Sequence, residues 1–373
     1  MILIYCPYGS TGGPSEQMDH FVRMIEKAVA PVGVERLDAY SDQGRLRSYW
    51  KQFIVGLSHQ NDVRRCKLVI VNGILNPGSW VLGLACARHG IPFIVVPHGD
   101  LIPTTIQDFR TTPKPLLKWA LWSAFCRRLL TQASAVIVGS ELEWQRLVAA
   151  GAGESRHTVI PPFVVQAPVG VASGGQYRTR LANYVLWMGR IANEKGLDLL
   201  FDCWPEVTRG YPGAQLVLAG SIYDKRLYAH LLRRRAALHL EESIVFSPYL
   251  TGAEKLEVLS GARCLALPSH YESFGIVVAE ALVVGTPVLV SNDTPWQHLP
   301  ANAGRVLPRM QDLWVAGMVE YLSAPTKLSV PVDDIRRVLG PFSECEVERQ
   351  WKALMKTLLP ITPPAPTQYA RAL

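Results

Sequence analysis

The sequence contains no uninterrupted apolar run of the roughly 18–20 residues that a membrane-spanning helix requires. Its start carries no basic leader and no cleavage-like site, which indicates a first strand rather than a signal peptide. The seven cysteines are odd in number, scattered and without a CxxC pair, so they argue against a disulfide framework and favour a reducing, cytoplasmic compartment. No internal repeat is visible.

The composition is that of a folded protein with two domains. Hydrophobic residues make up 49% and charged residues 18% of the 373 residues, enough for two domains that each bury a core. Short apolar runs alternate with amphipathic stretches, which favours parallel sheets covered by helices on both faces. The expected strands are 2–6, 68–72, 92–96, 135–138, 157–160, 184–188, 215–219, 244–246, 264–267 and 287–291. The expected helices are 15–30, 79–89, 114–131, 141–150, 197–208, 225–239, 253–261, 276–284 and 346–358.

A stretch near the middle interrupts this alternation. Residues 160–180 are rich in Pro, Gly and small residues, which indicates a linker. We therefore predict an α/β protein with two doubly wound domains, over residues 1–165 and 166–345. A C-terminal helix over 346–359 should pack back on the first domain, and the Pro-rich residues 360–373 should form a flexible tail. Because ligands of such sheets bind beyond the carboxyl ends of the strands, the facing edges should form an interdomain cleft.

Two glutamates stand out in the apolar, glycine-punctuated segment 268–292. Glu272 and Glu280 flank the expected start of a helix, where unpaired backbone N–H groups can bind an anion such as phosphate. At about 1.5 Å per residue the two carboxylates would lie roughly 12 Å apart. This separation suits opposite ends of one ligand and is too long for the carboxylate pair of a retaining glycosidase. A solvated Glu272 and a Glu280 paired with an arginine remain the alternative.

Cations follow the expected strand 184–188, with Gly189 at the turn and Arg190 and Lys195 beyond it. Two cations at the carboxyl end of a strand can bind diphosphate oxygens, arginine as a fork and lysine as a point charge. The alternative is a basic loop that only solubilises the surface.

The first half of the chain offers two further features. His98 ends the expected strand 92–96, and Gly12 and Gly13 precede a proline at the start of a helix. A loop-capping histidine and a tight strand–helix connection are the simpler interpretations.

These segments resemble a known family. The E-x7-E element Glu272–Glu280, "MGRIANEKGLDLL" (188–200) and "IPFIVVPHGDL" (91–101) occur in the order and spacing of the family 4 glycosyltransferases. These are retaining, nucleotide-sugar-dependent enzymes of the GT-B fold. The resemblance extends to about residue 358 and is stronger in the second half. It implies an N-terminal domain that binds the acceptor and a C-terminal domain that binds the nucleotide sugar.

The resemblance also implies roles for the residues of the second domain. Glu272 resembles the glutamate that contacts the hydroxyls of the donor sugar, and Glu280 the one that binds the ribose hydroxyls. The loop between them would hold the diphosphate through its backbone amides. This loop contains Ser273, Phe274, Gly275 and Ile276.

The remaining implied roles concern charge and the transferred sugar. Arg190 and Lys195, next to Gly189, would neutralise the leaving phosphates. Because their partners would be on the ligand, replacing either by alanine should leave folding nearly intact. His98 would lie close to the transferred sugar, and the backbone at Gly12 and Gly13 against the donor phosphate or the acceptor. The implied catalytic residues are His98, Arg190, Lys195 and Glu272.

The sequence departs from the family pattern in a few places. Residues 159–164 lack the Asn-Gly pair that many members have after the proline, and Ser273 stands where glycine is frequent. No D-x-D motif occurs, so we expect no metal site and no cofactor, with the cations supplied by Arg190 and Lys195.

Residues 110–132 combine five cations with three aromatic residues. This composition suits a helix that lies on an anionic membrane surface, and bacterial members of this appearance often act on lipid-linked acceptors. A core helix with solvated ends is the alternative. The residues are Arg110, Lys114, Lys118, Trp119, Trp122, Phe125, Arg127 and Arg128.

We therefore predict a retaining hexosyltransferase that uses a nucleotide-diphosphate sugar and a glycan or lipid-linked acceptor in bacterial surface polysaccharide biosynthesis, such as lipopolysaccharide or exopolysaccharide. It should be cytoplasmic, with peripheral contact to the inner face of the membrane. A GT-B sugar-nucleotide epimerase and a catalytically inactive scaffold are alternatives. A nucleic-acid-binding protein is suggested only by the isoelectric point near 9, and outside the segment 110–132 the chain lacks a concentrated basic stripe interleaved with base-stacking aromatic residues; no nucleic acid is expected as a partner.

Overall fold

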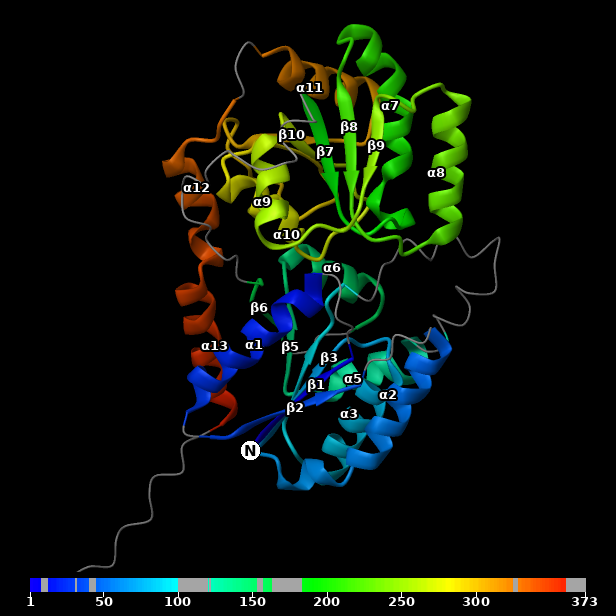
Figure 1. Ribbon diagram of the computed structural model, residues 1–373. Helices are drawn as coiled ribbons and strands as arrows, with labels where there is room; N and C mark the ends of the chain where they lie inside the picture. Colours follow the sequence, from blue (N-terminus) through cyan, green and yellow to red (C-terminus); the bar gives the residue numbers. More distant parts are fainter. Residues whose placement is uncertain are drawn as a thin grey trace, which may run out of the picture.

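Two six-stranded parallel sheets, one above the other in Figure 1, organise the chain. The computed structural model describes residues 1–7, 13–30, 32–39, 45–99, 120, 122–152, 157–162, 183–324 and 328–359. Among these residues no helix is long and apolar enough to cross a bilayer.

The first sheet has the strand order β2-β1-β3-β4-β5-β6. Its strands are β1 (Ile2–Cys6), β2 (Val34–Asp38), β3 (Leu68–Asn72), β4 (Phe93–Val96), β5 (Ala135–Val138) and β6 (His157–Val159). Its helices are α1 (Gly13–Val29), α2 (Arg45–His59), α3 (Pro77–His89), α5 (Arg127–Gln132) and α6 (Glu141–Ala149), with short helical turns η1 (Asp62–Arg65) and η4 (Trp122–Cys126).

Side chains of β1 alternate between two separate cores, because successive residues of a strand point to opposite faces. Ile2 and Ile4 pack with α1, whereas Leu3 and Tyr5 pack in the cluster that contains Leu82 of α3. This sheet therefore has helices on both faces, as the nearly continuous apolar strands predict.

The second sheet has the order β12-β11-β10-β7-β8-β9. Its strands are β7 (Tyr184–Met188), β8 (Gln215–Ala219), β9 (Ile244–Ser247), β10 (Cys264–Leu267), β11 (Val288–Ser291) and β12 (Gly304–Leu307). The surrounding helices are η5 (Asn193–Lys195), α7 (Leu197–Gly210), α8 (Lys225–Ala237), α9 (Gly252–Gly261), α10 (Ile276–Val283), α11 (Gln311–Ser323) and α12 (Val332–Leu339). Trp187, Trp204 and Trp314 are fully buried in its core.

The chain returns to the first sheet through η6 (Gly340–Phe342) and α13 (Glu344–Leu358). In Figure 1, α12 and α13 run along one side of the molecule from the upper to the lower half. The ring of Trp351 packs edge-on against Phe21 of α1, with centroids 5.1 Å apart, and Val347 and Met355 are buried in the same core.

The α/β class with two doubly wound units is confirmed, and each expected strand occurs. Two strands were missed, and both lie at sheet edges: β2 is mostly polar (VERLD) and β12 (GRVL) has an exposed arginine. Helices α2, α11 and α12 were also missed. Within the expected helix 114–131, residues 114–119 and 121 lie outside the described residues, as do the linker residues 163–180 and the tail 360–373.

Candidate active site

The candidate site lies where the strand order of the second sheet reverses. β7 and β10 are neighbours, and the chain continues outward from them in opposite directions, through β8 and β9 on one side and β11 and β12 on the other. At such a switch point the loops after the two strands diverge and can enclose a ligand. Lys195 follows β7 and Glu272 follows β10, so both predicted motifs meet at this point.

Glu272 and Lys195 form an ion pair there. Lys195 Nζ lies 2.8 Å from both carboxylate oxygens, and Ser269 Oγ donates to Glu272 Oε1 at 2.7 Å. The side chains are 9% exposed for Glu272 and 14% for Lys195. The loops approach closely because Gly196 has φ +66°, and a Cβ there would lie 2.0 Å from Pro268 O. The expectation that the partner of Lys195 is only on the ligand is therefore wrong.

Backbone amides at the start of α10 adjoin this pair. Gly275 turns the chain into the helix with φ +82°, a left-handed conformation that favours glycine. Beneath it, Trp296 Nε1 donates to Phe274 O at 2.6 Å, and the Phe274 ring packs on Trp296 and Phe342. The helix begins at Ile276, and amides of a first helical turn lack carbonyl partners within the helix. A rigid loop thus presents donors suited to an anion.

Arg190 has other contacts than the buried ion pair. Its guanidinium is 3.8 Å from Glu194 and stacks over the Tyr223 ring at 5.0 Å, and its side chain is 48% exposed. The preceding Gly189 fits against Gly220, where a Cβ would lie 1.7 Å from Gly189 O. Arg190 is therefore held by surface contacts.

Glu280 has a different cation. Lys255 Nζ of α9 lies 2.7 Å from Glu280 Oε1, and both side chains are partly buried. The two glutamates of the E-x7-E element are thus paired with two separate lysines. The alternative interpretation of the sequence, in which Glu280 pairs with an arginine, names the wrong type of cation.

His98 lies at the carboxyl end of β4 in the first domain, with a left-handed φ of +52°. Its Nε2 is 2.9 Å from Asn72 Oδ1. Asn72 Nδ2 donates to Tyr5 O at 2.9 Å, so its oxygen faces the histidine and accepts the Nε2 hydrogen. In the neutral ring, Nδ1 is then an acceptor.

Glu143 fixes the loop that carries His98. Its carboxylate is buried and accepts from Gly99 N at 2.7 Å and from Gly139 N at 2.8 Å. Ser140 caps the same helix, α6, and accepts from Glu143 N at 3.2 Å. One buried carboxylate thereby joins the ends of β4 and β5.

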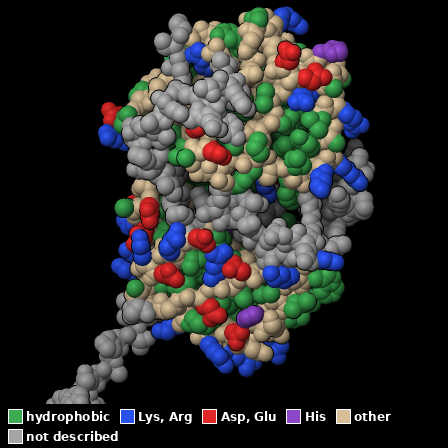
Figure 2. Space-filling model, viewed as in Figure 1, with side chains coloured by type: hydrophobic (Ala, Val, Ile, Leu, Met, Phe, Trp, Pro, Cys, Tyr) green, Lys and Arg blue, Asp and Glu red, His purple; other side chains and the backbone are tan. Residues whose placement is uncertain are grey.

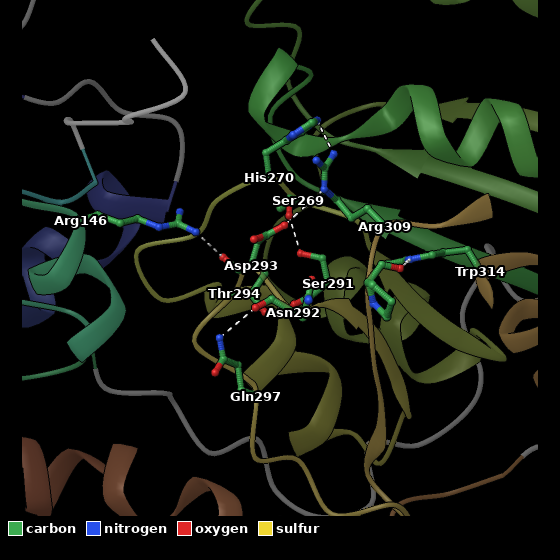
Figure 3. A network of polar contacts seen from close by, with 11 residues as sticks. Arg146, Ser269, His270, Ser291, Asn292, Asp293, Thr294, Gln297, Arg309 and Trp314 are labelled. Carbon is green, nitrogen blue, oxygen red and sulfur yellow. Dashed lines mark hydrogen bonds and ion pairs between the residues drawn. The ribbon is translucent and has the colours of Figure 1, made fainter. Parts of the chain in front are cut away.

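Contacts between the domains place the two loops face to face. Ser140 Oγ donates to Ser273 O at 2.7 Å. Arg146 of α6 donates to Asp293 O at 3.1 Å and lies over the Tyr271 ring at 4.6 Å. Figure 3 shows Arg146 reaching Asp293 from the neighbouring domain. The loop that carries His98 is also close, because a Cβ on Gly99 would lie 3.1 Å from Ser273 Cβ.

Polar contacts within the second domain support this side of the interface. Arg309 is 2.7 Å from His270 Nε2 and 3.4 Å from Asp293 Oδ2, and Ser291 Oγ donates to Ser269 O (Figure 3). The loops after β10 and β11 are thus tied together.

Several of these residues were missed from the sequence. Ser140 and Glu143 form the S-x-x-E pattern of a helix N-terminus, which was a usable signal. Asn72, Arg146 and Lys255 carry no local signal, because their partners lie far along the chain.

The predicted glycine turn of the first domain is described only in part: Gly13 begins α1, and Gly12 lies outside the described residues. In the part of the chain that the structure describes, no three His, Cys, Asp or Glu side chains are grouped so as to hold a metal ion.

Burial lowers the pKa of His98 to about 4, from an ordinary value of 6.5. The unfolded chain therefore binds a proton that the folded chain does not between these pH values, and stability rises with pH across this window. Above about pH 6.5 the ring is neutral in both states, and His98 then adds no pH dependence to the unfolding free energy. As the pH falls from 6.5 to 4, protonation of the unfolded chain should lower the unfolding free energy by up to about 3 kcal/mol. Urea unfolding at several pH values checks this: His98→Gln should flatten the curve, and parallel curves would contradict the assignment.

Two sequence families match the chain. Residues 4–162 match the family described as Glycosyl transferase 4-like domain, and residues 180–303 match Glycosyl transferases group 1. The D-inositol 3-phosphate glycosyltransferase of Segniliparus rotundus is 27% identical over 214 residues, which are 54% of this chain and 47% of that protein. The chain spans between about a quarter and a half of the length of the curated relatives it matches.

Solved structures resemble the chain over nearly its whole length. Sucrose-phosphate synthase from Thermosynechococcus elongatus has a TM-score of 0.77 at 18% identity, covering 96% of this chain and 98% of that one. Anabaena HepE in complex with UDP and glucose has a TM-score of 0.71 at 15% identity, covering 96% and 100%. These likenesses confirm the predicted GT-B fold. The two family matches, which between them cover residues 4–162 and 180–303, identify the chain as a glycosyltransferase of the family 4-like type.

Proposed function

We propose that this chain transfers a hexosyl group, with retention of configuration, from a nucleotide-diphosphate sugar to an acceptor hydroxyl. The observation that carries the proposal is the Lys195–Glu272 pair beside the start of α10, facing the His98 loop across the domain interface. The site combines groups for a diphosphate, for sugar hydroxyls and for an approaching acceptor.

The charges of the site suit departure of a nucleoside diphosphate. The first amides of α10 and the Lys195 ammonium would stabilise negative charge on the leaving phosphate, and they are held in place before the donor arrives. Arg190, at the surface, would add a second cation. Glu272, already fixed by Lys195 and Ser269, would accept hydrogen bonds from the sugar hydroxyls.

The chemistry that follows is front-face substitution. The leaving phosphate oxygen would take the proton of the acceptor hydroxyl as that hydroxyl attacks the anomeric carbon from the same face. Neutral His98 would bind a hydroxyl of the transferred sugar and would not need to carry charge.

The acceptor that we propose is a glycan or a lipid-linked saccharide of the bacterial surface, modified at the cytoplasmic face of the inner membrane. The net charge of +7 suits an anionic carrier or surface. A nucleotide-sugar donor is also supported by HepE, whose structure contains UDP and glucose.

A thermal-shift screen of UDP-, GDP- and ADP-sugars tests the donor class. A ligand at 100 times its dissociation constant should stabilise the fold by about 2.7 kcal/mol. The stabilising sugar nucleotide is then incubated with and without candidate acceptors. Release of nucleoside diphosphate that depends on an acceptor supports the transferase, whereas conversion of the sugar nucleotide alone would identify an epimerase.

The two glutamates should have separable effects on binding and turnover. Glu280→Gln should weaken binding of the bare nucleoside diphosphate at least about tenfold, because a charged hydrogen bond to the ribose contributes about 1.5–3 kcal/mol. Glu272→Gln should leave that binding within about twofold and lower turnover at least about tenfold, since its proposed partners are on the sugar.

Calorimetry with the nucleoside diphosphate alone, followed by turnover at saturating donor, separates these cases. Glu254→Gln, an exposed glutamate on the same helix as Lys255, is the matched charge control and should change neither quantity. Equal binding losses in the two site variants would refute the two-ended arrangement.

A further inference from the structure

Helix α2 buries its small and polar side and exposes its large apolar side. Tyr49, Trp50, Phe53, Ile54 and Leu57 are all exposed, with Trp50 at 63% and Ile54 at 58%. These residues recur at the spacing of one helical face. A surface helix ordinarily turns such a stripe toward the core, so α2 has the reverse orientation.

The buried side of α2 explains why the helix does not rotate about its axis to bury the apolar stripe. A Cβ on Gly56 would lie 3.0 Å from the Cα of Gly78 in α3, so the two helices approach through glycine. Gln52 Nε2 donates to Pro7 O at 3.3 Å and to Ser48 Oγ at 3.4 Å. Large apolar side chains do not fit at this contact, and close packing with α3 therefore keeps the stripe outside.

Charge accompanies the apolar stripe. Helix α2 contains no Asp or Glu, and its Arg47 and Lys51 are exposed among the apolar residues. Arg64 and Arg65 of the next turn, η1, are exposed as well. Figure 2 shows hydrophobic side chains with Lys and Arg beside them at the lower right, where α2 lies in Figure 1.

We propose that α2 is a docking surface for an anionic lipid bilayer. Tyr49 and Trp50 have the amphipathic rings that favour the headgroup region, and Phe53, Ile54 and Leu57 would enter the acyl boundary. Arg47 and Lys51 would meet the anionic headgroups. A protein partner would account for the apolar stripe, but the absence of any acidic residue on this helix matches a surface of uniform negative charge.

The neighbouring helices extend this surface. Phe125 is exposed and stacks on Trp80 of α3 with centroids 4.8 Å apart, and α3 is the helix on which α2 packs. Arg127 and Arg128 are exposed at the start of α5. The described end of the segment 110–132 therefore adjoins α3, while α2 itself supplies the larger exposed apolar face.

Sedimentation of the full chain with vesicles tests the proposal. The vesicles contain phosphatidylcholine alone or with roughly one third phosphatidylglycerol, in about 0.05 M or about 0.5 M NaCl. The wild type should bind the anionic vesicles at low salt and release at high salt. Trp50→Ser/Ile54→Ser and Arg47→Gln/Lys51→Gln should each weaken partitioning about tenfold or more.

Matched controls come from the second domain. Met310→Ser/Leu313→Ser, at the N-cap and in the first turn of α11, removes two exposed apolar side chains, and Lys225→Gln/Arg226→Gln on α8 removes two exposed cations. Both should bind like the wild type. Because the changed α2 side chains are exposed, urea midpoints of all variants should stay close to that of the wild type.

Three results would overturn the proposal. The first is that the wild type does not bind anionic vesicles at low salt. If light scattering then shows a dimer, and the Trp50→Ser/Ile54→Ser variant is a monomer, the α2 stripe is covered by a second copy of the chain. The second is an equal loss of binding in the control variants. The third is that vesicle binding is lost only when Lys114, Lys118, Arg127 and Arg128 are all replaced with Gln, and not in the α2 variants. That result would place the membrane contact on the segment 110–132.

Discussion

Lys195→Ala should lower turnover at saturating donor at least about a hundredfold and also lower the unfolding free energy by about 3 kcal/mol. The turnover loss follows from removing a fixed cation beside the leaving phosphate. The stability loss follows from the ligand-free structure, where Lys195 Nζ contacts both oxygens of the largely buried Glu272. Without the lysine, the Glu272 carboxylate keeps its hydrogen bond from Ser269 but has no positive charge beside it to offset its burial.

Urea unfolding and donor-saturated kinetics measure the two effects independently. Arg190→Ala is the comparison, because its side chain is 48% exposed and its ion pair with Glu194 spans 3.8 Å. It should reduce turnover and change the unfolding free energy by less than about 0.5 kcal/mol.

A neutral double variant separates structure from catalysis. Lys195→Met/Glu272→Gln removes both charges, so it should recover most of the stability lost in Lys195→Ala without recovering turnover. If Lys195→Ala instead unfolds like the wild type, the ion pair is not maintained before the donor binds. If the double variant regains turnover, neither residue stabilises the transition state.

Glu143→Ala should have the second largest effect, although Glu143 belongs to neither predicted motif. Its carboxylate accepts from the amides of Gly99 and Gly139, and an unpaired buried N–H costs about 1–3 kcal/mol. We expect a loss of about 3 kcal/mol in unfolding free energy. Turnover should fall at least about tenfold, because the loop that carries His98 loses its anchor.

Binding of the nucleoside diphosphate distinguishes this positional role from general damage. The side chains proposed to bind it, those of Arg190, Lys195 and Glu280, lie in the other domain, so its dissociation constant should stay within about twofold of the wild-type value. Glu141→Ala, on the same helix and 59% exposed, should change little, and Glu143→Gln should be intermediate because it keeps one acceptor oxygen. A parallel loss of nucleotide binding in Glu143→Ala would contradict the assignment.

Ten of the twelve strands in the described part of the chain, and the class of fold, could be predicted from the sequence. Strands β3 and β7 coincide with the predicted ranges because a strand buried on both faces is a continuous apolar run, which a short window detects. The polar edge strand β2 lacks such a run, so it is recognised only from its parallel pairing with β1 in the structure. The sequence also located Lys195 and Glu272, since each follows a detectable strand.

The pairing of these residues could not be predicted from the sequence, because it follows from the tertiary structure. Lys195 and Glu272 are 77 residues apart, and they meet because β7 and β10 are neighbours at the switch point of the sheet. Glu143 joins Gly99 and Gly139 because β4 and β5 end side by side. The exposed apolar side of α2 was likewise decided by its packing on α3. Apolar periodicity and helix caps act within a few residues, whereas these contacts depend on crossover connections that bring distant segments together.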